Sequence, residues 1–539
     1  MELESLDIPA INQFASKYMK QEEPVTSFFH YNINEQDVFS RRLEDLGERE
    51  FPREGLVTCI ASYMESLPSS DAVETSLEKL KNDAVAVVAG QQAGLLTGPL
   101  YTIHKIVSVI RLAREQEQKL NHPVVPVFWI AGEDHDYQEV NHIFLEQDGK
   151  IKKNGYPEQV VDKRMTSDVE YDPAVMKNWI SSILKVLGET EFTAGLADEM
   201  DGLIREGEDI VTFFARFIMT LFKDYGLLVI DSSYGALRKL EAPYFRHLIE
   251  NSREITDQVL MQQKTIQAEG FNTQLEISSD AANIFLNLQN ERALLERDGS
   301  GFKDKNNDSF FTKEELLGIL DDQPGRLSNN VVTRPLMQEW LFPTLSFIGG
   351  PGEIAYWGEL KKAFEFMGMN MPPVMPRLNI TILERTVAKR IEDLSLSLQE
   401  VVRSGVSHVR DEFLDSLKPN ELEGELHEIE TYLMAKYEGI KKEASAVDSN
   451  LEPIVDKNLE IHRKQFEFLR KRTEKSIRDK NERQLSRFDL IENSIRPNGG
   501  PQERTLNILY YMNRFGPDFV NRLTNLPFTF DGTHKVVHL

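Results

Sequence analysis

AVAVVAGQQAGLLTGPLYTIHK, residues 84–105, gives the clearest indication of the fold class. It begins with a short run, 84–89, that is apolar on both faces, passes through a glycine-rich turn and enters an amphipathic stretch from Tyr101 to about Gln118. A strand that is apolar on both faces is typical of a parallel sheet with helices on both sides. The stretch therefore predicts a strand, a turn and a helix of an α/β domain.

Two further runs repeat the strand signal. PVVPVFWIA, residues 123–131, and GLLVID, residues 226–231, are again continuously apolar, and helical stretches separate the runs. Strands of this kind that alternate with helices predict a Rossmann-like core, which we place at residues 1–384. The intervals at about 150–210 and 250–330 are longer and more polar than single crossovers, so we expect them to hold two inserted subdomains.

From about Arg385 to Leu490 the pattern changes to many charges, with apolar residues spaced alternately by three and four. This spacing is typical of long helices in a coiled coil. The apolar stripes are Leu422, Leu426, Ile429, Leu433 and Ile440, and Leu459, His462, Phe466, Leu469, Thr473 and Ile477. Proline predicts helix breaks at Pro419 and within 448–453. An antiparallel arm, a dimerisation arm and a plain helical bundle all fit. We expect the C-terminal segment, 491–539, to pack back on the core or on the coiled coil.

Composition narrows the class of protein. The chain has 539 residues, 87 acidic against 62 basic, a formal net charge of −25 and one cysteine, Cys59. The acidic balance argues against a general nucleic-acid binder, because phosphate neutralisation needs clustered Lys and Arg. One cysteine excludes a disulfide framework. The acidic N-terminus lacks the features of a signal peptide, and no apolar run approaches the roughly 20 residues that span a bilayer. We expect a cytoplasmic protein without a membrane segment.

The first candidate site is the glycine-rich turn between the first strand and its helix. Thr97 can cap this helix and Pro99 suits its first turn. The free N–H groups and the dipole at a helix start form an anion site. The turn has neither GxGxxG nor GxxxxGK[ST], and a simple capped turn is the alternative. The residues expected to contact substrate here are Gln91, Gln92, Thr97, Gly98 and Tyr101.

The second candidate is EDHD, residues 133–136, directly after the second strand, with Asn141 close behind. Crowded carboxylates perturb one another's pKa values, and a carboxylate beside a histidine sets a general base near neutral pH. We predict that His135 deprotonates an attacking amine, with Asp134 or Asp136 orienting it. The same side chains would also suit magnesium or another hard ion. An acidic surface turn is the alternative.

The third candidate is FIGGPGEIAYWG, residues 347–358. Here Glu353 could receive a substrate amine, and Tyr356 and Trp357 could line the pocket, although large aromatic residues are more often found in the core. Arg334 or Arg377 could hold a carboxylate or a phosphate through the guanidinium fork.

Five motifs in order resemble the family of cysteine-adding enzymes of bacillithiol biosynthesis. They are GQQAGLLTGPLYTIHK, WIAGEDHDYQEVNH, IGGPGEIAYW, MPRLNITILE and IRPNGGPQERTLNILYY, and the resemblance covers essentially the whole chain. It implies a cytoplasmic homodimer that pairs through the coiled coil. It also implies a Rossmann-like core similar to class I nucleotidyltransferases, with two connecting-peptide insertions.

The implied reaction joins L-cysteine to glucosaminyl-malate through an amide bond, the last step of bacillithiol biosynthesis. The cysteine carboxylate needs activation, which ATP would supply as an adenylate or an acyl phosphate. The paired histidines of class I enzymes are absent after the first strand, where only His104 occurs. The resemblance also implies an ADP site near the coiled coil, which we place at Arg496, Gly499, Gly500, Gln502, Arg504 and Tyr510.

A second hypothesis comes from another class of protein. A non-catalytic, nucleotide-binding coiled-coil dimer could act as a scaffold or regulator. The absence of standard ATPase motifs favours this hypothesis, and an assay for the thiol product separates the two.

Overall fold

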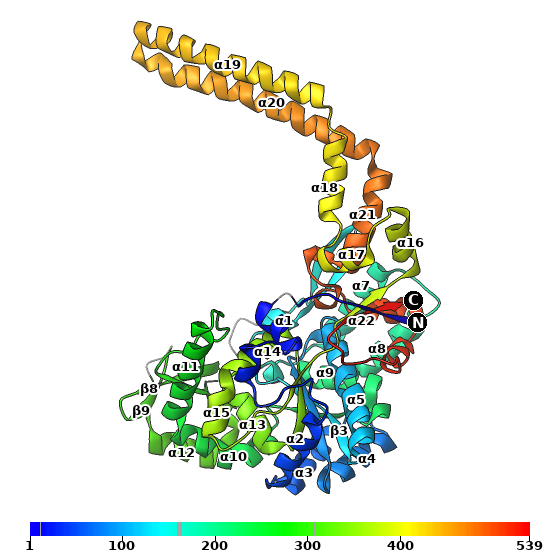
Figure 1. Cartoon of the computed structure of the whole chain (residues 1–539), viewed down its shortest axis with the longest axis vertical. Helices are drawn as coiled ribbons and strands as arrows, with labels where there is room; N and C mark the ends of the chain where they lie inside the picture. Colours follow the sequence, from blue (N-terminus) through cyan, green and yellow to red (C-terminus); the bar gives the residue numbers. More distant parts are fainter. Residues whose placement is uncertain (11, 159–163, 290, 306–308) are drawn as a thin grey trace. The chain divides into compact units, whose positions relative to one another are not determined.

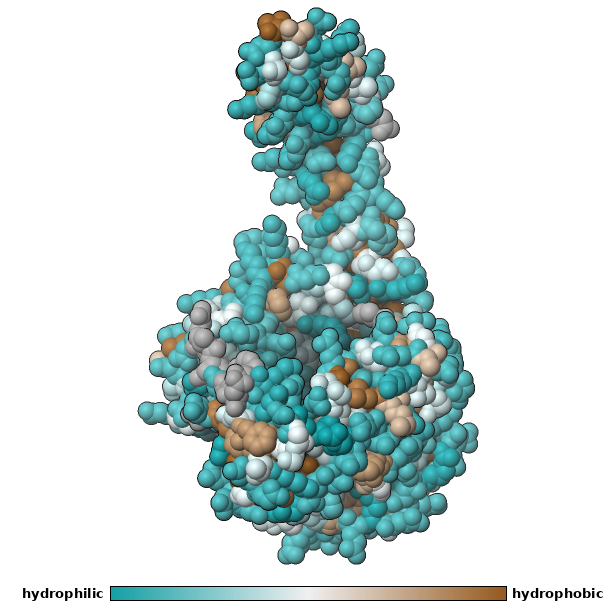
Figure 2. Space-filling view, turned by 90° about the vertical axis from the view of Figure 1, so that its left-hand side faces the viewer, coloured by the Kyte–Doolittle hydropathy of each residue, from teal (hydrophilic) through white to brown (hydrophobic). Residues whose placement is uncertain are grey.

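The computed structural model describes residues 1–10, 12–158, 164–289, 291–305 and 309–539. The chain divides into two compact units. The α/β unit contains Met1–Gln147, Ile151–Leu383 and Gly500–Leu539, and the helical unit contains Asp148–Lys150 and Glu384–Gly499. No helix among the described residues is both long enough and apolar enough to cross a membrane. The surface seen in Figure 2 is largely hydrophilic, with scattered apolar residues, as the many charged residues lead one to expect.

A five-stranded parallel sheet forms the centre of the α/β unit. Its order is β13-β12-β2-β3-β6. The strands are β13 (Val374–Pro376), β12 (Thr344–Gly349), β2 (Val85–Gln91), β3 (Val124–Ile130) and β6 (Leu228–Asp231). Almost every residue of these strands is buried, because helices cover both faces of the sheet. The three strands expected from the sequence, and their parallel arrangement, are confirmed.

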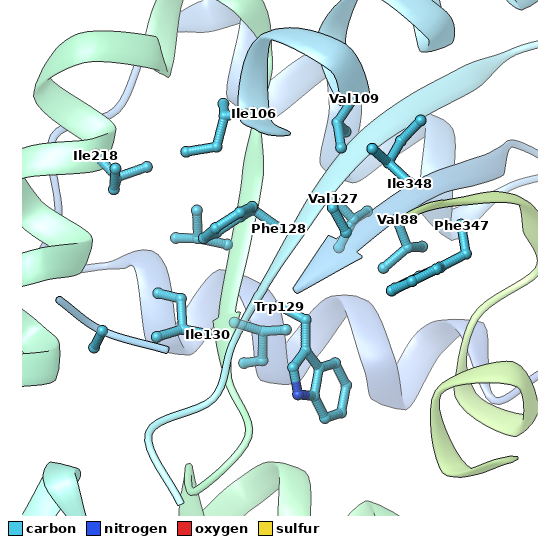
Figure 3. Close-up of a cluster of buried hydrophobic side chains, with 14 of the residues drawn as sticks. Val88, Ile106, Val109, Val127, Phe128, Trp129, Ile130, Ile218, Phe347 and Ile348 are labelled. Atoms are coloured by element: carbon cyan, nitrogen blue, oxygen red, sulfur yellow. The ribbon is translucent and has the colours of Figure 1, made fainter. Parts of the chain in front are cut away.

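The apolar face of α5 (Tyr101–Leu120) packs on β2 and β3. Figure 3 shows Ile106 and Val109 of α5 and Ile218 of α9 (Ile210–Phe222) among side chains of β2, β3 and β12. The other helices around the sheet are α1 (Gln13–Met19), α2 (Val38–Gly47), α3 (Arg53–Met64), α4 (Asp71–Lys81), α13 (Thr333–Leu341), α14 (Pro351–Trp357) and α15 (Lys361–Phe366). The core is thus continuous across the sheet, and the lone Cys59 is buried in α3 as a small apolar side chain.

Two long excursions leave the sheet. The first, between β3 and β6, contains α6 (Tyr137–Val140), β4 (His142–Gln147), β5 (Lys150–Gly155), α7 (Pro173–Leu187), α8 (Thr193–Leu203) and α9 (Ile210–Phe222). The second, between β6 and β12, starts with α10 (Gly235–Glu250) and α11 (Ser252–Ala268) and ends with α13. Residues 159–163, 290 and 306–308 of the expected insertions lie outside the described residues.

The second excursion builds an antiparallel sheet of its own. Its order is β10-β9-β8-β7-β11, and α12 (Lys313–Asp322) lies between β10 and β11 in the chain. The strands are β7 (Ala281–Leu288), β8 (Glu291–Asp298), β9 (Gly301–Asp304), β10 (Phe310–Thr312) and β11 (Leu327–Asn329). We call this the inserted sheet, because it provides one wall of the site described below.

The two ends of the chain meet in a three-stranded sheet of the α/β unit. Strand β15 (His534–His538) lies between β1 (Glu2–Leu6) and β14 (Ile380–Leu383). Helices α22 (Ile508–Phe515) and α23 (Phe519–Thr524) complete this C-terminal part. Residues from Gly500 onward therefore belong to the α/β unit, whereas Glu384–Gly499 belongs to the helical unit.

The helical unit is dominated by two long helices, α19 (Asn420–Val447) and α20 (Glu452–Lys480), which pack along each other (Figure 1). The remaining helices are α16 (Arg385–Asp393), α17 (Leu398–Ser404), α18 (Ser407–Ser416) and α21 (Glu482–Ile495). Both predicted breaks are confirmed, because α19 begins after Pro419 and the chain turns between α19 and α20. Arg470 of α20 joins Glu423 and Glu430 of α19, at 3.1 Å each.

Candidate active site

A cavity of about 640 Å³ opens at the carboxyl edge of the parallel sheet. Four neighbouring strands deliver residues to it at or soon after their last residue, namely Gln91 from β2, Glu133 to Asp136 after β3, Gly350 after β12 and Arg377 after β13. The inserted sheet forms a second wall with Phe285, Arg292, Leu294 and Asn329. Open α/β sheets bind ligands at this edge. The cavity is therefore the candidate active site.

All three sequence motifs contribute to the cavity wall. The predicted residues that line it are Gln91, Gln92, Tyr101, Asp134, His135, Asp136, Glu353, Tyr356, Arg377 and Arg504. They are separated by up to some four hundred residues in the sequence, and the strand ends bring them together.

Four predicted contacts lie elsewhere. Trp357 is fully buried and stacks on Phe347, with ring centroids 4.3 Å apart, so it belongs to the core. Asn141 is buried beyond α6, and Thr97 is fully buried. Gly98 lines a separate crevice with Pro99. None of these four lines the main cavity.

The prediction that Thr97 caps the helix is wrong. α5 begins at Tyr101, without a side-chain cap, and Leu96, Thr97 and Gly98 all have positive φ. The Leu100 N–H donates instead to the Leu506 carbonyl at 2.9 Å. The C-terminal segment thus occupies the helix start, where the sequence predicted an anion. A local motif could not reveal this contact, because its partner is four hundred residues away.

Lys105 lines the cavity and connects the glycine-rich turn to the third motif. Its Nζ donates to the Gly90 carbonyl at 2.7 Å, to Gln91 Oε1 at 3.1 Å and to Glu353 Oε2 at 2.6 Å. Burial lowers the pKa of this lysine, and the Glu353 carboxylate acts against that shift. Glu353 is therefore engaged by an internal ammonium group at the position where the sequence predicted a substrate amine.

A buried cluster of charges surrounds Arg377. Its Nη1 and Nη2 donate to the two carboxylate oxygens of Glu503 at 2.5 and 2.6 Å, and His104 Nδ1 lies 3.0 Å from Glu503 Oε2. Burial acts to raise the pKa of Glu503, but the Arg377 charge and the hydrogen bonds hold it well below its ordinary value. The charge of Arg377 is therefore matched inside the protein.

Arg334 differs from Arg377 in its partners. Its Nη2 donates to the Tyr356 hydroxyl at 2.6 Å, and Nη1 lies 3.5 Å from Gln338 Oε1. No described carboxylate forms an ion pair with it. Arg504, which is exposed at the cavity, likewise forms no ion pair with a described residue. These two guanidinium groups are the cations of the cavity that remain available to an anionic ligand.

Arginines hold the first two carboxylates of the EDHD segment. Glu133 is buried and pairs with Arg238, which also donates to Glu241 at 2.8 Å. Asp134 Oδ1 lies 3.0 Å from Arg292 Nη1, and Asp134 Oδ2 accepts from Gln92 Nε2 at 3.1 Å. Within the described ranges, no group of three or more His, Cys, Asp or Glu side chains is arranged to hold a metal ion.

His135 lies in the cavity wall close to Asp136. Its Nε2 is 3.9 Å from Asp136 Oδ1, and its ring meets the edge of Phe285 with centroids 6.0 Å apart. Asp134 faces Gln92 and Arg292, whereas Asp136 is the carboxylate of this segment that lies close to the imidazole. The geometry suits a base held between a carboxylate and an aromatic edge.

Asp231 is a buried aspartate that contacts the loop after β3. The Gly132 N–H donates to Asp231 Oδ1 at 3.1 Å, and the Ser233 N–H donates to the same oxygen at 3.0 Å. A Cβ on Gly132 would lie 2.3 Å from Asp231 Oδ1, so only glycine fits there. Burial raises the pKa of Asp231 to about 7, although hydrogen bonds from Ser233 act to lower it.

The residues predicted to bind ADP fall into both units. Arg496 and Gly499 belong to the helical unit, where Arg496 donates to the carbonyls of Val402 and Gly499 at 3.3 and 2.8 Å. Gly500, Gln502, Arg504 and Tyr510 belong to the α/β unit. The Gln502 amide both donates to and accepts from the backbone of Ile382 at 2.8 Å. Arg504 alone among the six lines the main cavity.

Sequence reasoning missed several residues of the cavity. Lys105, Arg292 and Asn329 were not singled out, and Arg334 was named only as an alternative to Arg377. Lys105 carried a weak signal, because it is a charged residue on the buried first turns of an otherwise apolar helix face. Arg292 and Asn329 carried none, because only the fold of the inserted sheet brings them to the cavity.

Comparison with known proteins places the chain in a family. Residues 1–378 match the sequence model described as "Bacillithiol biosynthesis BshC, N-terminal Rossmann-like domain", and residues 380–539 match "Bacillithiol biosynthesis BshC, C-terminal coiled-coil domain". Relatives named "Putative cysteine ligase BshC" occur in Geobacillus sp. (strain WCH70) and Bacillus velezensis, each 41% identical, and in Bacillus cereus (strain AH187), 39% identical. All three alignments cover 100% of both chains. The chain therefore belongs to the bacillithiol biosynthesis BshC family.

Proposed function

We propose that this protein is a cysteine ligase that joins the carboxylate of L-cysteine to the amine of glucosaminyl-malate. The names of the relatives support the ligase activity. The observation that carries the proposal is the cavity at the carboxyl edge of the sheet, where His135 and two available guanidinium groups face the same space. A ligase for this reaction needs a base for an amine and cations for carboxylates.

Arg334 and Arg504 hold the anionic groups of the substrates. Malate brings two carboxylates, and the chain as a whole is strongly acidic, so local cations must offset the repulsion from the overall field. Arg377 is a poorer candidate, because Glu503 already accepts both of its outer N–H groups. Charge-assisted pairing with a planar carboxylate suits a guanidinium group better than an ammonium group.

His135 is the general base in this proposal. The amine nitrogen of glucosaminyl-malate attacks the activated carbonyl carbon of cysteine and forms the new C–N bond. His135 takes one proton from that nitrogen, and the leaving group departs with the electrons of the broken C–O bond. Asp136, whose Oδ1 lies 3.9 Å from His135 Nε2, stabilises the positive charge of the protonated imidazole.

The reaction requires activation of the cysteine carboxylate, and whichever of Arg334 and Arg504 does not hold the malate fits a nucleotide phosphate. ATP bound there would supply the leaving group. The start of α5 fits a phosphate less well, because the Leu506 carbonyl accepts from the first N–H group. The nucleotide site is therefore proposed inside the cavity.

The proposal includes a homodimer formed through the helical unit. Ile454, Ile461 and Phe468 lie seven residues apart on α20, and their exposed fractions are 61%, 49% and 56%. A seven-residue spacing keeps such residues on one helix face, which suits a coiled-coil seam. Ile429 and Ile440 of the predicted stripe on α19 are also about half exposed. A second copy with the same stripe would bury these side chains.

Mass spectrometry of the reaction mixture tests the activity. The purified full-length protein is incubated with cysteine, glucosaminyl-malate, ATP and magnesium, and each component is omitted in turn. We expect the amide product only when both substrates and ATP are present. We expect His135→Ala to lower kcat by about 100-fold or more, as removal of a general base does. Absence of product with wild-type protein under varied nucleotides and metals would favour the non-catalytic dimer instead.

A further inference from the structure

Asn329 is a polar residue of the cavity wall that the chemistry above does not use. It is the last residue of β11, lines the cavity and is only 1% exposed. No described residue donates to its side-chain oxygen or accepts from its side-chain nitrogen. Its backbone carbonyl accepts from Arg292 Nη2, which fixes the position of the residue in the wall. A buried amide without partners costs free energy, so a ligand that pairs with it gains affinity.

The other amides of the cavity have partners within the protein. Gln91 accepts from Lys105, and Gln92 donates to Asp134. Asn330 donates to Asn283 Oδ1 at 2.9 Å and accepts the backbone N–H of Val332 at 2.9 Å, so it supports the start of α13. Asn329 therefore differs from its neighbours in the wall, because both its donor and its acceptor lack a partner among the described residues.

The chemistry of an amide identifies the kind of ligand group it would pair with. Asn329 is neutral and offers one donating and one accepting atom, as hydroxyl groups do. A substrate carboxylate would pair more strongly with Arg334 or Arg504, and an ammonium group with the exposed carboxylates of Asp136 or Glu276. The last torsion of an asparagine is soft, so the amide can turn toward a group in the cavity.

We infer that Asn329 is a specificity residue for the sugar portion of the acceptor substrate, forming hydrogen bonds with a free hydroxyl of the glucosamine ring. This inference rests on the proposed function, because it takes glucosaminyl-malate as the acceptor. It assigns the inserted sheet the recognition of the sugar, while the parallel sheet supplies the base and the anion sites. A site that buries such an amide discriminates strongly against an analogue that lacks the hydroxyl.

The test combines variants of the protein with variants of the substrate. Asn329→Ala and Asn329→Ser are compared with Asn287→Ala, a matched change in β7 of the same inserted sheet at a residue that does not line the cavity. Each protein is assayed with glucosaminyl-malate and with analogues that each lack one free sugar hydroxyl. Binding of glucosaminyl-malate is measured separately by calorimetry without cysteine or ATP. Circular dichroism checks that each variant is folded.

We expect Asn329→Ala to raise the Kd for glucosaminyl-malate, and to lower kcat/KM, by about 10- to 100-fold, with little change in the KM for cysteine. With the analogue that lacks the hydroxyl bound by Asn329, wild type and Asn329→Ala should have the same kcat/KM. The hydrogen bond is then already lost in both proteins, so the substitution has no further effect. Asn287→Ala should behave as wild type throughout.

Two results would overturn the inference while leaving the proposed function intact. One is an active Asn329→Ala protein whose affinity for glucosaminyl-malate equals that of wild type. The other is that, with every deoxy analogue, the loss of kcat/KM caused by Asn329→Ala adds to the loss caused by removing the hydroxyl. Additive losses would mean that Asn329 and the hydroxyls do not interact. If Asn329→Ala fails to fold, Asn329→Ser gives the same comparison. A wild-type protein that neither binds nor converts glucosaminyl-malate would instead contradict the proposed function.

Discussion

Arg292 of the inserted sheet and Asp134 of the loop after β3 form an ion pair, with Nη1 and Oδ1 3.0 Å apart. Arg292 also stacks over Phe285, with its guanidinium carbon 3.9 Å from the ring centroid, and donates from Nε to Ser328 Oγ at 3.0 Å. Because Asp134 is followed directly by His135, this pair ties the proposed base to the inserted sheet. The cavity therefore depends on both sheets for its geometry.

Arg292→Ala should lower kcat/KM by about 100-fold, because Asp134 loses its cation and the His135 loop loses its anchor. Steady-state kinetics of product formation measure this effect. Arg246→Ala is the control, since Arg246 makes only an exposed pair with Asp321 and should leave the kinetics unchanged. Equal activity of Arg292→Ala and wild type would show that the anchor does not matter.

Arg334 and Arg377 should respond differently to the same substitution. Arg334→Gln should raise the KM for glucosaminyl-malate or ATP by about 10- to 100-fold and change stability little, because its hydrogen-bond partners among the described residues are neutral. Arg377→Gln should reduce the free energy of unfolding by about 3–5 kcal/mol, because Glu503 is left buried without its cation. Kinetics and urea denaturation of both variants distinguish the two roles. A large loss of stability in Arg334→Gln, together with a purely kinetic effect in Arg377→Gln, would mean that Arg377 and not Arg334 binds the anionic ligand.

Asp231 should make stability fall as pH rises. Its folded-state pKa of about 7 lies above the ordinary value of 3.8, so the folded protein binds the proton more tightly than the unfolded chain does. This contribution is complete below about pH 4 and is lost as pH rises toward and through 7. The amide introduced by Asp231→Asn cannot ionise and keeps an oxygen for the Gly132 and Ser233 N–H groups.

The stability of Asp231→Asn relative to wild type should therefore increase by about 2–3 kcal/mol between pH 5 and pH 8. Urea denaturation at the two pH values measures the change. Asp224→Asn, at an exposed aspartate, is the control and should show no such trend. A constant difference between Asp231→Asn and wild type would mean that Asp231 does not titrate in this range.

The double variant Ile461→Glu, Phe468→Glu should convert the proposed dimer into a monomer, because it places charges on the exposed stripe of α20. Light scattering after size-exclusion chromatography gives the mass, and circular dichroism should show unchanged helix content. Glu467→Gln, on another face of the same helix, should remain dimeric. A wild-type protein that is monomeric at micromolar concentration would remove the basis for this interface.

Three of the five strands of the central sheet, β2, β3 and β6, could be predicted from the sequence because each is apolar on both faces. β12 and β13 could not, since β12 contains two polar residues and β13 has only three residues. The edge at which their loops meet follows from parallel pairing alone. Gln91 and His135 could therefore be placed at one edge from the sequence, whereas Glu353 follows β12, which could not be predicted.

The roles of these residues within the site could not be predicted, because they depend on partners far away in the chain. Glu353 faces Lys105, and Arg377 faces Glu503 of the C-terminal segment, so two expected ligand contacts are internal pairs. Thr97 fails as a cap for the same reason, since the Leu506 carbonyl takes its place. Local sequence identifies which chemical groups reach an edge of a sheet, whereas pairing between distant segments decides which of them remain available.

A crystal structure of the protein with glucosaminyl-malate bound would show whether the substrate binds in the proposed cavity. We expect density for the ligand in the cavity at the carboxyl edge of the parallel sheet, with a malate carboxylate on Arg334 or Arg504 and the amine facing His135. Glucosaminyl-malate bound elsewhere on the chain, without contact to Arg334 or His135, would contradict the proposed active site.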